Sequence, residues 1–547
     1  MGWANHLLIA PIVLPLATGA LLLLFDERRH TLKALVSLAS TVALLLIAIV
    51  LLGVADTPTA EGAVRTGVYL LANWPAPFGI VLVLDRLSAL MLALTGVLAL
   101  TSLIFASARW HIAGPHFHTL FQLLLMGLNG AFLTGDLFNL FVFFEVLLAA
   151  SYGLVLYGSG ALRVRAGLHY IAINLAASAL FLIGVSLIYG VTGTLNMADL
   201  AGRIAAVPAE DRMLLEAGAA ILGIAFLVKA GMWPLGFWLP TAYMAAAAPV
   251  AAIFAILSKV GVYILLRLSL LLFGAESGAS AEFGASWLLV GGMATIAFGA
   301  TGVLASQAMG RLAGFYVLVS SGTMLAAIGV ASVPVTSGAL FYMVSSTLAI
   351  SAFFLLVELV ERIQDPAANV LAVTMEAYGD DMDEDEVNEE VGVLIPGTLA
   401  ALGICFAGCA VLIAGLPPLS GFIAKFALIS AVFNNDGLGG AANAVNATAW
   451  AMTGLLLLAG LAGMIAMTRM GIRTFWAPID GTVPRVRVSE FFPIAFLLAV
   501  CLGITVQGGS VMRYMDTTAQ SLHAPSDYVR SVLSAKRVPA PGKEGVE

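Results

Sequence analysis

Residues 312–357 read LAGFYVLVSSGTMLAAIGVASVPVTSGALFYMVSSTLAISAFFLLV and contain no Asp, Glu, Lys, Arg or His. A helix needs roughly 20 apolar residues to cross the hydrocarbon core of a membrane, so this run is long enough for two crossings. Similar uncharged runs occupy residues 34–55, 170–198, 287–310 and 391–424. The runs are continuous rather than alternating, and lipid leaves unpaired backbone groups unsatisfied. They therefore predict membrane-spanning helices and not a β-barrel.

The composition of the whole chain agrees with this interpretation. Of its 547 residues, 61% are hydrophobic and 10% are charged, which leaves too little polar surface for a water-soluble body. The first apolar stretch, residues 7–25, has no basic residues before it and no convincing cleavage site, and we expect a retained helix rather than a signal peptide. The sequence therefore predicts an all-α, polytopic membrane bundle.

The hydropathy pattern predicts about fourteen helices. Their expected ranges are 5–25, 33–54, 80–107, 117–134, 137–158, 167–191, 213–238, 246–270, 285–305, 309–331, 336–361, 391–433, 448–468 and 490–508. The twelfth range is too long for one span and contains Gly415, Pro417 and Pro418, and the seventh contains Gly231 and Pro234. Because proline removes a backbone donor and clashes with the preceding turn, we expect both helices to be broken.

The two expected breaks resemble each other in sequence. Residues 230–238 read AGMWPLGFW and residues 414–422 read AGLPPLSGF, with Ala, Gly, Pro and Leu in register. The match is short, but it pairs discontinuous helices at corresponding places in two halves of the chain, which is a common plan in transporters.

Basic residues fall mainly on one side of the predicted topology, which should be cytoplasmic and would leave both termini outside. The residues on that side are Arg28, Arg29, Lys33, Arg109, Arg163, Arg165, Arg311, Arg362, Arg469, Arg473, Arg485 and Arg487. Basic residues after Gly508 fit this orientation less well. The acidic segment 364–390 carries much of the net charge of −7 and is expected to be a solvated cytoplasmic loop.

Four ionisable residues are expected deep in the membrane, where charge is costly and usually functional. Glu145 lies nine residues beyond Asp136, about 13 Å along its helix. Lys229 precedes the first break, Lys259 lies midway along the eighth helix and Lys425 follows the second break. A Glu145–Lys229 pair could release a proton toward Lys259 and Lys425 when the pair separates. The alternative is a static buried ion pair with the other lysines reaching an interface.

Other charged residues are weaker candidates. We expect Asp136, His169 and Arg311, together with Arg163 and Arg165, near cytoplasmic helix ends, where a proton-entry role is open but interfacial charge is ordinary. A separate group is expected to be structural: Asp85 and Arg86 satisfy each other, Arg267 and Glu358 reach an interface, and His116 and His118 flank a helix at its aqueous edge.

No cofactor is implied by the residues themselves. The chain has three cysteines, and Cys405 and Cys409 lie one helical turn apart in an apolar helix, so neither a metal site nor a disulfide framework is indicated. No phosphate-binding glycine loop, cluster motif or basic, aromatic-interleaved stripe is present, which argues against redox, nucleotide and nucleic-acid chemistry.

Several segments resemble the D-type membrane component of Mrp-type cation/proton antiporters. They are GLNGAFLTGDLFNLFVFFEVLLAASYGL (127–154), RAGLHYIAINLAASALFLIG (165–184), YGVTGTLNMADLA (189–201) and GLPPLSGFIAKF (415–426). A fifth segment, KAGMWPLGFWLPTAYMAAAAPVAAIFAILSKVGVYILLR (229–267), is similar more broadly to the antiporter-like proton-pumping subunits of respiratory complex I and membrane-bound hydrogenases. The likeness covers nearly the whole chain.

The resemblance implies two inverted five-helix repeats within the bundle. It places N-terminal helices in residues 1–110, the first antiporter half in 111–273, the second in 284–470, and the last helix with a polar tail in 471–547. It also implies that Glu145 and Lys229 act as the proton-moving switch, with Lys259 and then Lys425 as relays. Many relatives carry His at the position of Gly236, and His or Lys at that of Ser345. Hydroxyls of Ser345, Ser346 and Thr347, or water, would have to replace the second group.

The resemblance further implies a secondary transporter rather than an enzyme. It would exchange Na⁺ or K⁺ for H⁺ in the bacterial cytoplasmic membrane, together with subunits of the Mrp A, B, C, E, F and G types. Two alternatives stay open from the sequence: a proton pump driven by electron transfer in a redox complex, and a membrane scaffold whose ion pairs serve assembly.

Overall fold

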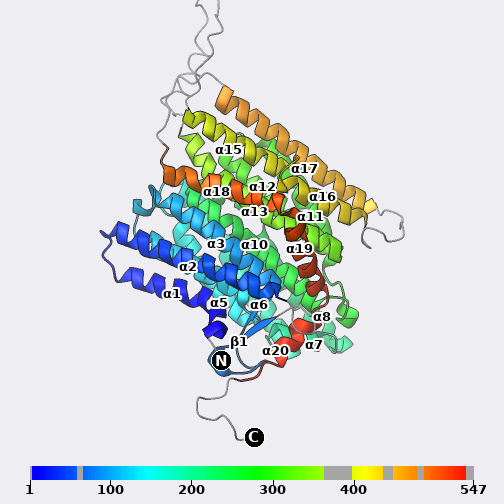
Figure 1. The fold of residues 1–547 in the computed structure, drawn as a ribbon. Helices are drawn as coiled ribbons and strands as arrows, with labels where there is room; N and C mark the ends of the chain where they lie inside the picture. The colour runs from blue at the N-terminus through cyan, green and yellow to red at the C-terminus, as the bar shows by residue number, and fades with distance from the viewer. Residues whose placement is uncertain (1–2, 58–65, 363–396, 435–446, 477–485, 538–547) are drawn as a thin grey trace, which may run out of the picture.

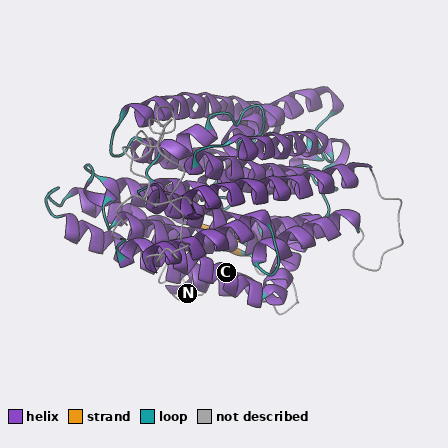
Figure 2. Cartoon of the chain, turned by 90° about the horizontal axis from the view of Figure 1, so that it is seen from above, coloured by secondary structure: helices purple, strands orange, loops and turns teal. Residues whose placement is uncertain are grey.

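The computed structural model describes residues 3–57, 66–362, 397–434, 447–476 and 486–537. Long helices lie side by side, with α1 and α2 at one edge and α15 and α17 at the opposite edge (Figure 1). Seen from above, the long helices run roughly parallel to one another (Figure 2). The predicted all-α membrane bundle is confirmed.

The helix bounds follow the hydropathy pattern closely. The helices are α1 (Ala10–Leu23), α2 (His30–Asp56), α3 (Arg86–Ala106), α4 (Phe117–Leu133), α5 (Leu137–Val155), α6 (Ala161–Thr192), α7 (Met197–Ile204), α8 (Ala209–Ala230), α9 (Leu239–Ala245), α10 (Ala248–Leu272), α11 (Ala285–Ala305), α12 (Met309–Val330), α13 (Val333–Glu361), α15 (Gly397–Ala414), α16 (Ser420–Phe433), α17 (Ala447–Gly471), α18 (Val488–Val506), α19 (Gly508–His523) and α20 (Ser526–Leu533). Short helical turns occur at Trp3–Leu8, Leu71–Asn73, Trp110–Ile112, Gly278–Ser280 and Ile472–Trp476.

Within the described residues, 12 helices are long and apolar enough to cross a membrane, and α1, α4 and α16 are shorter apolar helices. The number of fourteen spans stays a prediction. The acidic loop 364–390 lies outside the described residues.

Two elements at one end of the bundle differ from the predicted pattern. The third helix was expected to begin at residue 80, but Val81–Leu84 forms strand β2, which pairs antiparallel with β1 (Gly67–Leu70). The side chain of Asp85 then accepts from the N–H of Ser88 and caps α3, so the helix begins only at Arg86. The sequence VLVL is as hydrophobic as a membrane-spanning helix, although its valines also favour a strand. Hydropathy alone therefore placed the start of the helix too early.

The region expected as a polar tail contains two ordered helices. α19 packs against α13 and α10, and α20 packs against α7 and β1. In α19 the residues Met515, Thr518, Ala519 and Leu522 are buried and share one face at helical spacing. Both helices, drawn in red in Figure 1, therefore cover one end of the bundle.

Both predicted helix breaks are present and have the same backbone geometry. α8 ends at Gly231 and α15 at Gly415, each with a left-handed φ, of 78° and 75° respectively. The N–H of Met232 donates to the Leu227 carbonyl and that of Leu416 to the Val411 carbonyl, both at 3.0 Å. This is the hydrogen bond of a glycine-terminated helix end. The chain then resumes as α9 and α16.

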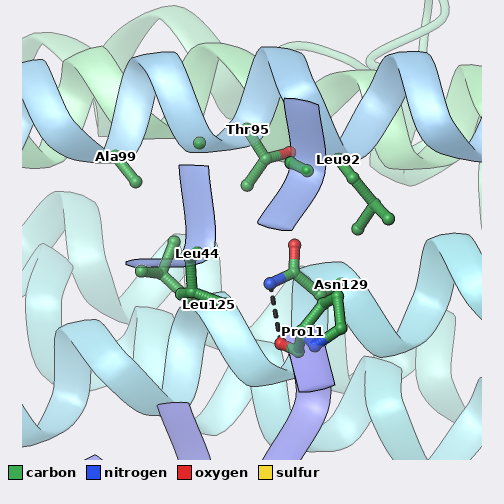
Figure 3. A pocket seen from close by; sticks show the side chains of 9 residues that line it. Pro11, Leu44, Leu92, Thr95, Ala99, Leu125 and Asn129 are labelled. Atoms are coloured by element: carbon green, nitrogen blue, oxygen red, sulfur yellow. Dashed lines mark hydrogen bonds between the residues drawn. The ribbon is translucent and has the colours of Figure 1, made fainter. Parts of the chain in front are cut away.

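Proline also shapes the packing of the first helix. Pro15 has no N–H, so the carbonyl of Pro11, one turn earlier, lacks its usual helical donor. The Asn129 amide from α4 donates to that oxygen at 2.9 Å, beside a cavity of about 10 Å³ that Thr95 also lines (Figure 3). An interhelical side chain thus satisfies a backbone group that lipid would leave unpaired.

The centre of the bundle is formed by α10 and α13. Both helices are buried along nearly their whole length, and α10 contacts α3, α8, α12 and α13. A charged side chain on α10 is therefore far from both lipid and solvent.

Candidate functional site

Lys229 is held by a neutral side chain. It lies in the last turn of α8, is buried, and donates from Nζ to the Asn174 Oδ1 of α6 at 3.0 Å. Its ammonium also lies 5.6 Å from the centroid of the Phe144 ring. Asn174 is 1% exposed, and its amide nitrogen donates to the carbonyl of Tyr170 at 2.8 Å, which fixes the oxygen toward the lysine.

Glu145 is separate from this contact. Among the ion pairs between described residues, none joins Glu145 to Lys229. Glu145 is half-buried, on the face of α5 that also carries exposed Phe138 and Val142, and its Oε1 is buried with no hydrogen-bond partner. The expected switch residues are thus near enough to interact electrostatically but are not bonded in this state.

Lys259 is held by hydroxyl groups. It lies on α10, is 1% exposed, and donates to the Ser320 Oγ at 2.8 Å and the Ser321 Oγ at 3.3 Å, both from α12. Ser320 in turn lies 2.8 Å from the Ser346 Oγ of α13. Three helices therefore meet around this lysine through neutral polar groups.

Lys425 is held by backbone carbonyls. It lies on α16, and its Nζ donates to the carbonyls of Ala414 at 2.7 Å and Ile413 at 3.3 Å, at the end of α15. These carbonyls lack helical donors because α15 stops there, and a cation at a helix C-terminus is stabilised by the helix dipole. Two glycines leave room: a Cβ on Gly415 would lie 2.5 Å from the Lys425 Cδ, and one on Gly460 would lie 3.3 Å from its Nζ.

A small cavity joins Lys425 to the serines of α13. Its volume is about 20 Å³, and Ser345, Ser346, Tyr316 and Tyr342 line it together with the lysine. A space of this size holds one water molecule. The structure thus brings Lys259 and Lys425 to opposite ends of one polar region.

The departures from the family pattern have separate structural reasons. A Cβ on Gly236 would collide with the carbonyl oxygen of Gly231, so this turn accepts no side chain. Ser345 bonds to Ser420 across the α13–α16 contact at 2.8 Å. Thr347 donates back to the Met343 carbonyl at 2.6 Å and does not reach the cavity, contrary to the expectation that it would contribute there.

One weaker candidate lies at the wrong end. Asp136 caps α5 by accepting from the Asn139 N–H at 2.9 Å and forms a β-bridge with Asn196. α5 runs from this point toward Arg163, so the two residues lie at opposite ends of the bundle, and the expectation that both lie on the same side was wrong. Burial raises the pKa of Asp136. His169 and Arg311 are exposed.

Two structural expectations were also wrong. Asp85 pairs not with Arg86 but with Arg267, through two contacts of 2.8 and 2.9 Å, while Arg86 pairs with Asp56. Arg267 is 4% exposed and does not reach an interface. Burial opposes the charge on Asp85, but the attraction of the guanidinium outweighs it and lowers the pKa of this carboxyl.

Two further side chains differ from expectation at the other end. Glu358 pairs with Arg362 and accepts from the Trp110 indole at 2.8 Å rather than extending to an interface. His118 is 3% exposed and neither ring nitrogen has a hydrogen-bond partner, so it does not lie at an aqueous edge.

The residues that sequence reasoning missed are neutral. Asn174 and Ser320 hold Lys229 and Lys259, and both lie within uncharged runs. A search for ionisable residues passes over them. The available signal was an amide one third of the way along an apolar helix, which lipid disfavours unless it has a partner.

Comparison with known proteins identifies the relatives of this chain. The family model described as "NADH:quinone oxidoreductase/Mrp antiporter, TM" matches residues 134–450. A relative from Rhizobium meliloti (strain 1021), named as the D component of a probable K⁺/H⁺ antiporter, is 64% identical over 98% of this chain and 99% of its own length. The D component of the Na⁺/H⁺ antiporter of Alkalihalophilus pseudofirmus is 33% identical over 97% and 99%.

Solved structures show the same fold. A chain of the Mrp complex from Dietzia sp. DQ12-45-1b superposes with a TM-score of 0.80 at 26% identity, covering 98% of this chain and 100% of that one. A chain of respiratory complex I from Thermus thermophilus gives a TM-score of 0.72 at 20% identity, covering 97% and 100%, which supports the fold alone. The resemblance drawn from the sequence is confirmed.

Proposed function

We propose that this chain, which belongs to the NADH:quinone oxidoreductase/Mrp antiporter transmembrane family, is the D-type component of a multisubunit cation/proton antiporter and conducts protons through its buried charges. The relatives named as D components of K⁺/H⁺ and Na⁺/H⁺ antiporters support the exchange of a monovalent cation for H⁺. The transport is secondary, driven by the proton-motive force, and involves no enzymatic reaction.

One observation carries the proposal: the three candidate lysines are held by neutral acceptors, whereas buried Lys33, at the end of the bundle, pairs with Glu27. Lys229 donates to an amide, Lys259 to hydroxyls and Lys425 to backbone carbonyls. A lysine in a static ion pair leaves an uncompensated charge behind when it loses its proton. A lysine bound by neutral groups does not, so it can release and regain a proton within the bundle.

Glu145 completes the set in this proposal. Its carboxylate has no hydrogen bond to Lys229, and its buried Oε1 has no partner among the described residues, so we assign it the role of an acceptor that the lysine reaches when α5 and α8 shift. We assign these two residues to the first antiporter half, 111–273, and Lys425 to the second, 284–470, which follows the N-terminal helices 1–110 and precedes the final segment 471–547.

The assembly and location follow from the same relatives. We propose that the chain works with membrane subunits of the Mrp A, B, C, E, F and G types in the bacterial cytoplasmic membrane. Both termini lie outside in this proposal, because Arg109, Arg163, Arg362 and Arg487 gather at the opposite end of the bundle.

Two alternatives predict different behaviour. A redox-driven pump needs an electron-transfer partner, and the chain's likeness to complex I is a likeness of fold. A scaffold role predicts that neutralising Lys229 or Glu145 spoils assembly and that exchanging the two charges restores it. Neither has an observation in its favour equal to the neutral partners of the lysines.

The test is cation-dependent proton flux in everted vesicles that contain the whole complex with Lys229→Ala. Assembly is followed by native gels in parallel, and Lys536→Ala, an exposed lysine outside the bundle, is the matched control. We expect normal assembly with exchange lost in Lys229→Ala and kept in Lys536→Ala. Normal assembly with normal exchange in Lys229→Ala would remove this residue from the path.

A further inference from the structure

We propose that the hydroxyls of Ser320 and Ser346, with one water molecule, relay the proton between Lys259 and Lys425. The inference rests on the proposed function and specifies its route through the second half. It gives a definite role to two neutral side chains, one on α12 and one on α13.

The direction of the hydrogen bonds around Lys259 supports the relay. A charged lysine has only donors, so Ser320 must accept from it at 2.8 Å. The Ser320 hydroxyl keeps its own hydrogen, and the Ser346 Oγ lies 2.8 Å away as an acceptor. An oriented donor chain thus leads from α10 through α12 to α13.

The cavity supplies the next step. Ser346 and Lys425 both line a space of about 20 Å³, and the hydroxyl-bearing side chains of Ser345, Tyr316 and Tyr342 line it too. A buried water needs roughly 10–15 Å³ and two to four polar partners, and this space provides both. A water here would contact the serine at the end of the chain and the ammonium of Lys425.

The transfer balances without any further reactant. The Lys259 ammonium gives a proton to the Ser320 oxygen, while the proton of Ser320 passes to Ser346 and that of Ser346 to the water. The water gives one of its protons to the neutral Lys425 amine. Lys259 ends neutral and Lys425 charged, and each hydroxyl must then rotate to restore its starting orientation. The same steps reversed carry a proton the other way.

Neighbouring hydroxyls do not serve this route. The Ser321 Oγ accepts from Lys259 at 3.3 Å, but among the described residues no hydrogen bond continues from it to α13. Thr347 donates to the Met343 carbonyl at 2.6 Å and does not line the cavity. Ser346 donates to the same carbonyl only at 3.3 Å and does line the cavity, so its hydroxyl must rotate from Met343 to reach the water. Each of the two proposed relay serines therefore has a neighbouring hydroxyl residue that does not take part in the proposed hydrogen-bonded relay.

These neighbours provide matched variants for the test, which measures cation-dependent proton flux by the whole complex in everted vesicles. Ser320→Ala removes the hydroxyl that joins Lys259 to Ser346. We expect its exchange rate to fall about tenfold or more, and Ser321→Ala, which removes the weaker acceptor of the same lysine, to lose much less. Ser346→Ala should fall further than Thr347→Ala, which should exchange like the unaltered protein.

Each outcome decides the proposal. Equal exchange in Ser320→Ala and Ser321→Ala, with assembly intact, would overturn the relay. If Ser320→Ala fails to assemble, the Ser346→Ala and Thr347→Ala pair decides in the same way. Lys229→Ala and Lys259→Ala together distinguish the proposed function from the serine route. Retained exchange in both variants would overturn proton conduction through the buried charges, whereas lost exchange in both beside an active Ser320→Ala would overturn only the serine route.

Discussion

The Nζ of Lys425 donates to the carbonyl oxygen of Ala414 at 2.7 Å, so the lysine that follows the second helix break caps the half-helix that precedes it. The first break is arranged differently, because Lys229 lies before it and bonds sideways to Asn174. The state of Lys425 is therefore coupled directly to the end of α15. A neutral Lys425 binds these carbonyls more weakly, and the break is where α15 and α16 can move relative to each other.

Gly415→Ala should impair exchange by disturbing this cap. The added Cβ would lie 2.5 Å from the Lys425 Cδ, and the left-handed φ of 75° costs a non-glycine residue about 1–2 kcal/mol. Losing a hydrogen bond to a charged group is worth about 1.5–3 kcal/mol, which corresponds to about tenfold or more in rate. Proton flux in everted vesicles measures the effect. Gly454→Ala on α17 is the control, since its Cβ meets no atom within 4 Å, and equal flux in both variants would contradict the prediction.

Asn174→Leu should lower exchange while the complex still assembles. The substitution removes the Oδ1 that accepts from Lys229 and leaves a buried ammonium with a weaker set of partners, at a cost of about 1.5–3 kcal/mol. The expected loss is again about tenfold or more. Ser186→Ala on the same helix removes an exposed hydroxyl that bonds only to Leu182, and its flux should stay unchanged. A fully active Asn174→Leu complex would show that proton exchange does not require the hydrogen bond that positions Lys229.

The sequence was sufficient to find the charges of the site but not their partners. Glu145, Lys229, Lys259 and Lys425 stand out because each interrupts an apolar helix. Hydropathy and proline placement likewise predicted the helices and both breaks. A single Asn or Ser in a membrane-spanning helix costs little free energy when another helix supplies a partner. Asn174 and Ser320 therefore do not stand out from the many other neutral residues of the spanning helices.

Partner choice between distant residues was beyond sequence reasoning for a different reason. Asp85 and Arg86 are adjacent and opposite in charge, which made a local pair the natural expectation. Arg267, 182 positions away, takes Asp85 because α10 packs against α3 in the centre of the bundle. Only the tertiary arrangement brings these side chains together. The β1–β2 hairpin was missed similarly, since hydropathy does not separate a short buried strand from the start of a helix.

The contact between α19 and α13 should weaken in acid. The Nε2 of His523 lies 2.9 Å from the Thr336 Oγ1, and burial lowers the pKa of this histidine below its usual 6.5. A lowered folded-state pKa means that the stabilisation is complete above about pH 6.5 and is lost as the pH falls through the folded value. Limited proteolysis of the intact complex should cut the α19–α20 region faster at about pH 5.5 than at about pH 7.5.

His523→Gln supplies the control for this pH effect. Glutamine can keep a hydrogen bond to Thr336 but has no charge to gain, so its cleavage rate should not rise in acid beyond that of an unfolded substrate. A variant that retains the full acid sensitivity would show that His523 is not the group responsible.

Loss of one partner of the Asp85–Arg267 pair alone should strongly destabilise the end of the bundle that carries the β1–β2 hairpin. Both side chains are buried, and removing one partner of such a pair leaves an uncompensated charge that costs about 3–5 kcal/mol. Arg267→Leu should therefore lower the unfolding temperature of the detergent-purified complex. Asp85→Asn/Arg267→Leu should recover much of the loss, because no charge then remains buried while Asn can still cap α3.

Asp527→Asn, at the exposed 3.7 Å pair with Arg530, should change the free energy of unfolding by less than about 1 kcal/mol. A double variant as unstable as Arg267→Leu would mean that the guanidinium acts through its contacts with Tyr263 and Tyr528 rather than through the charge of Asp85.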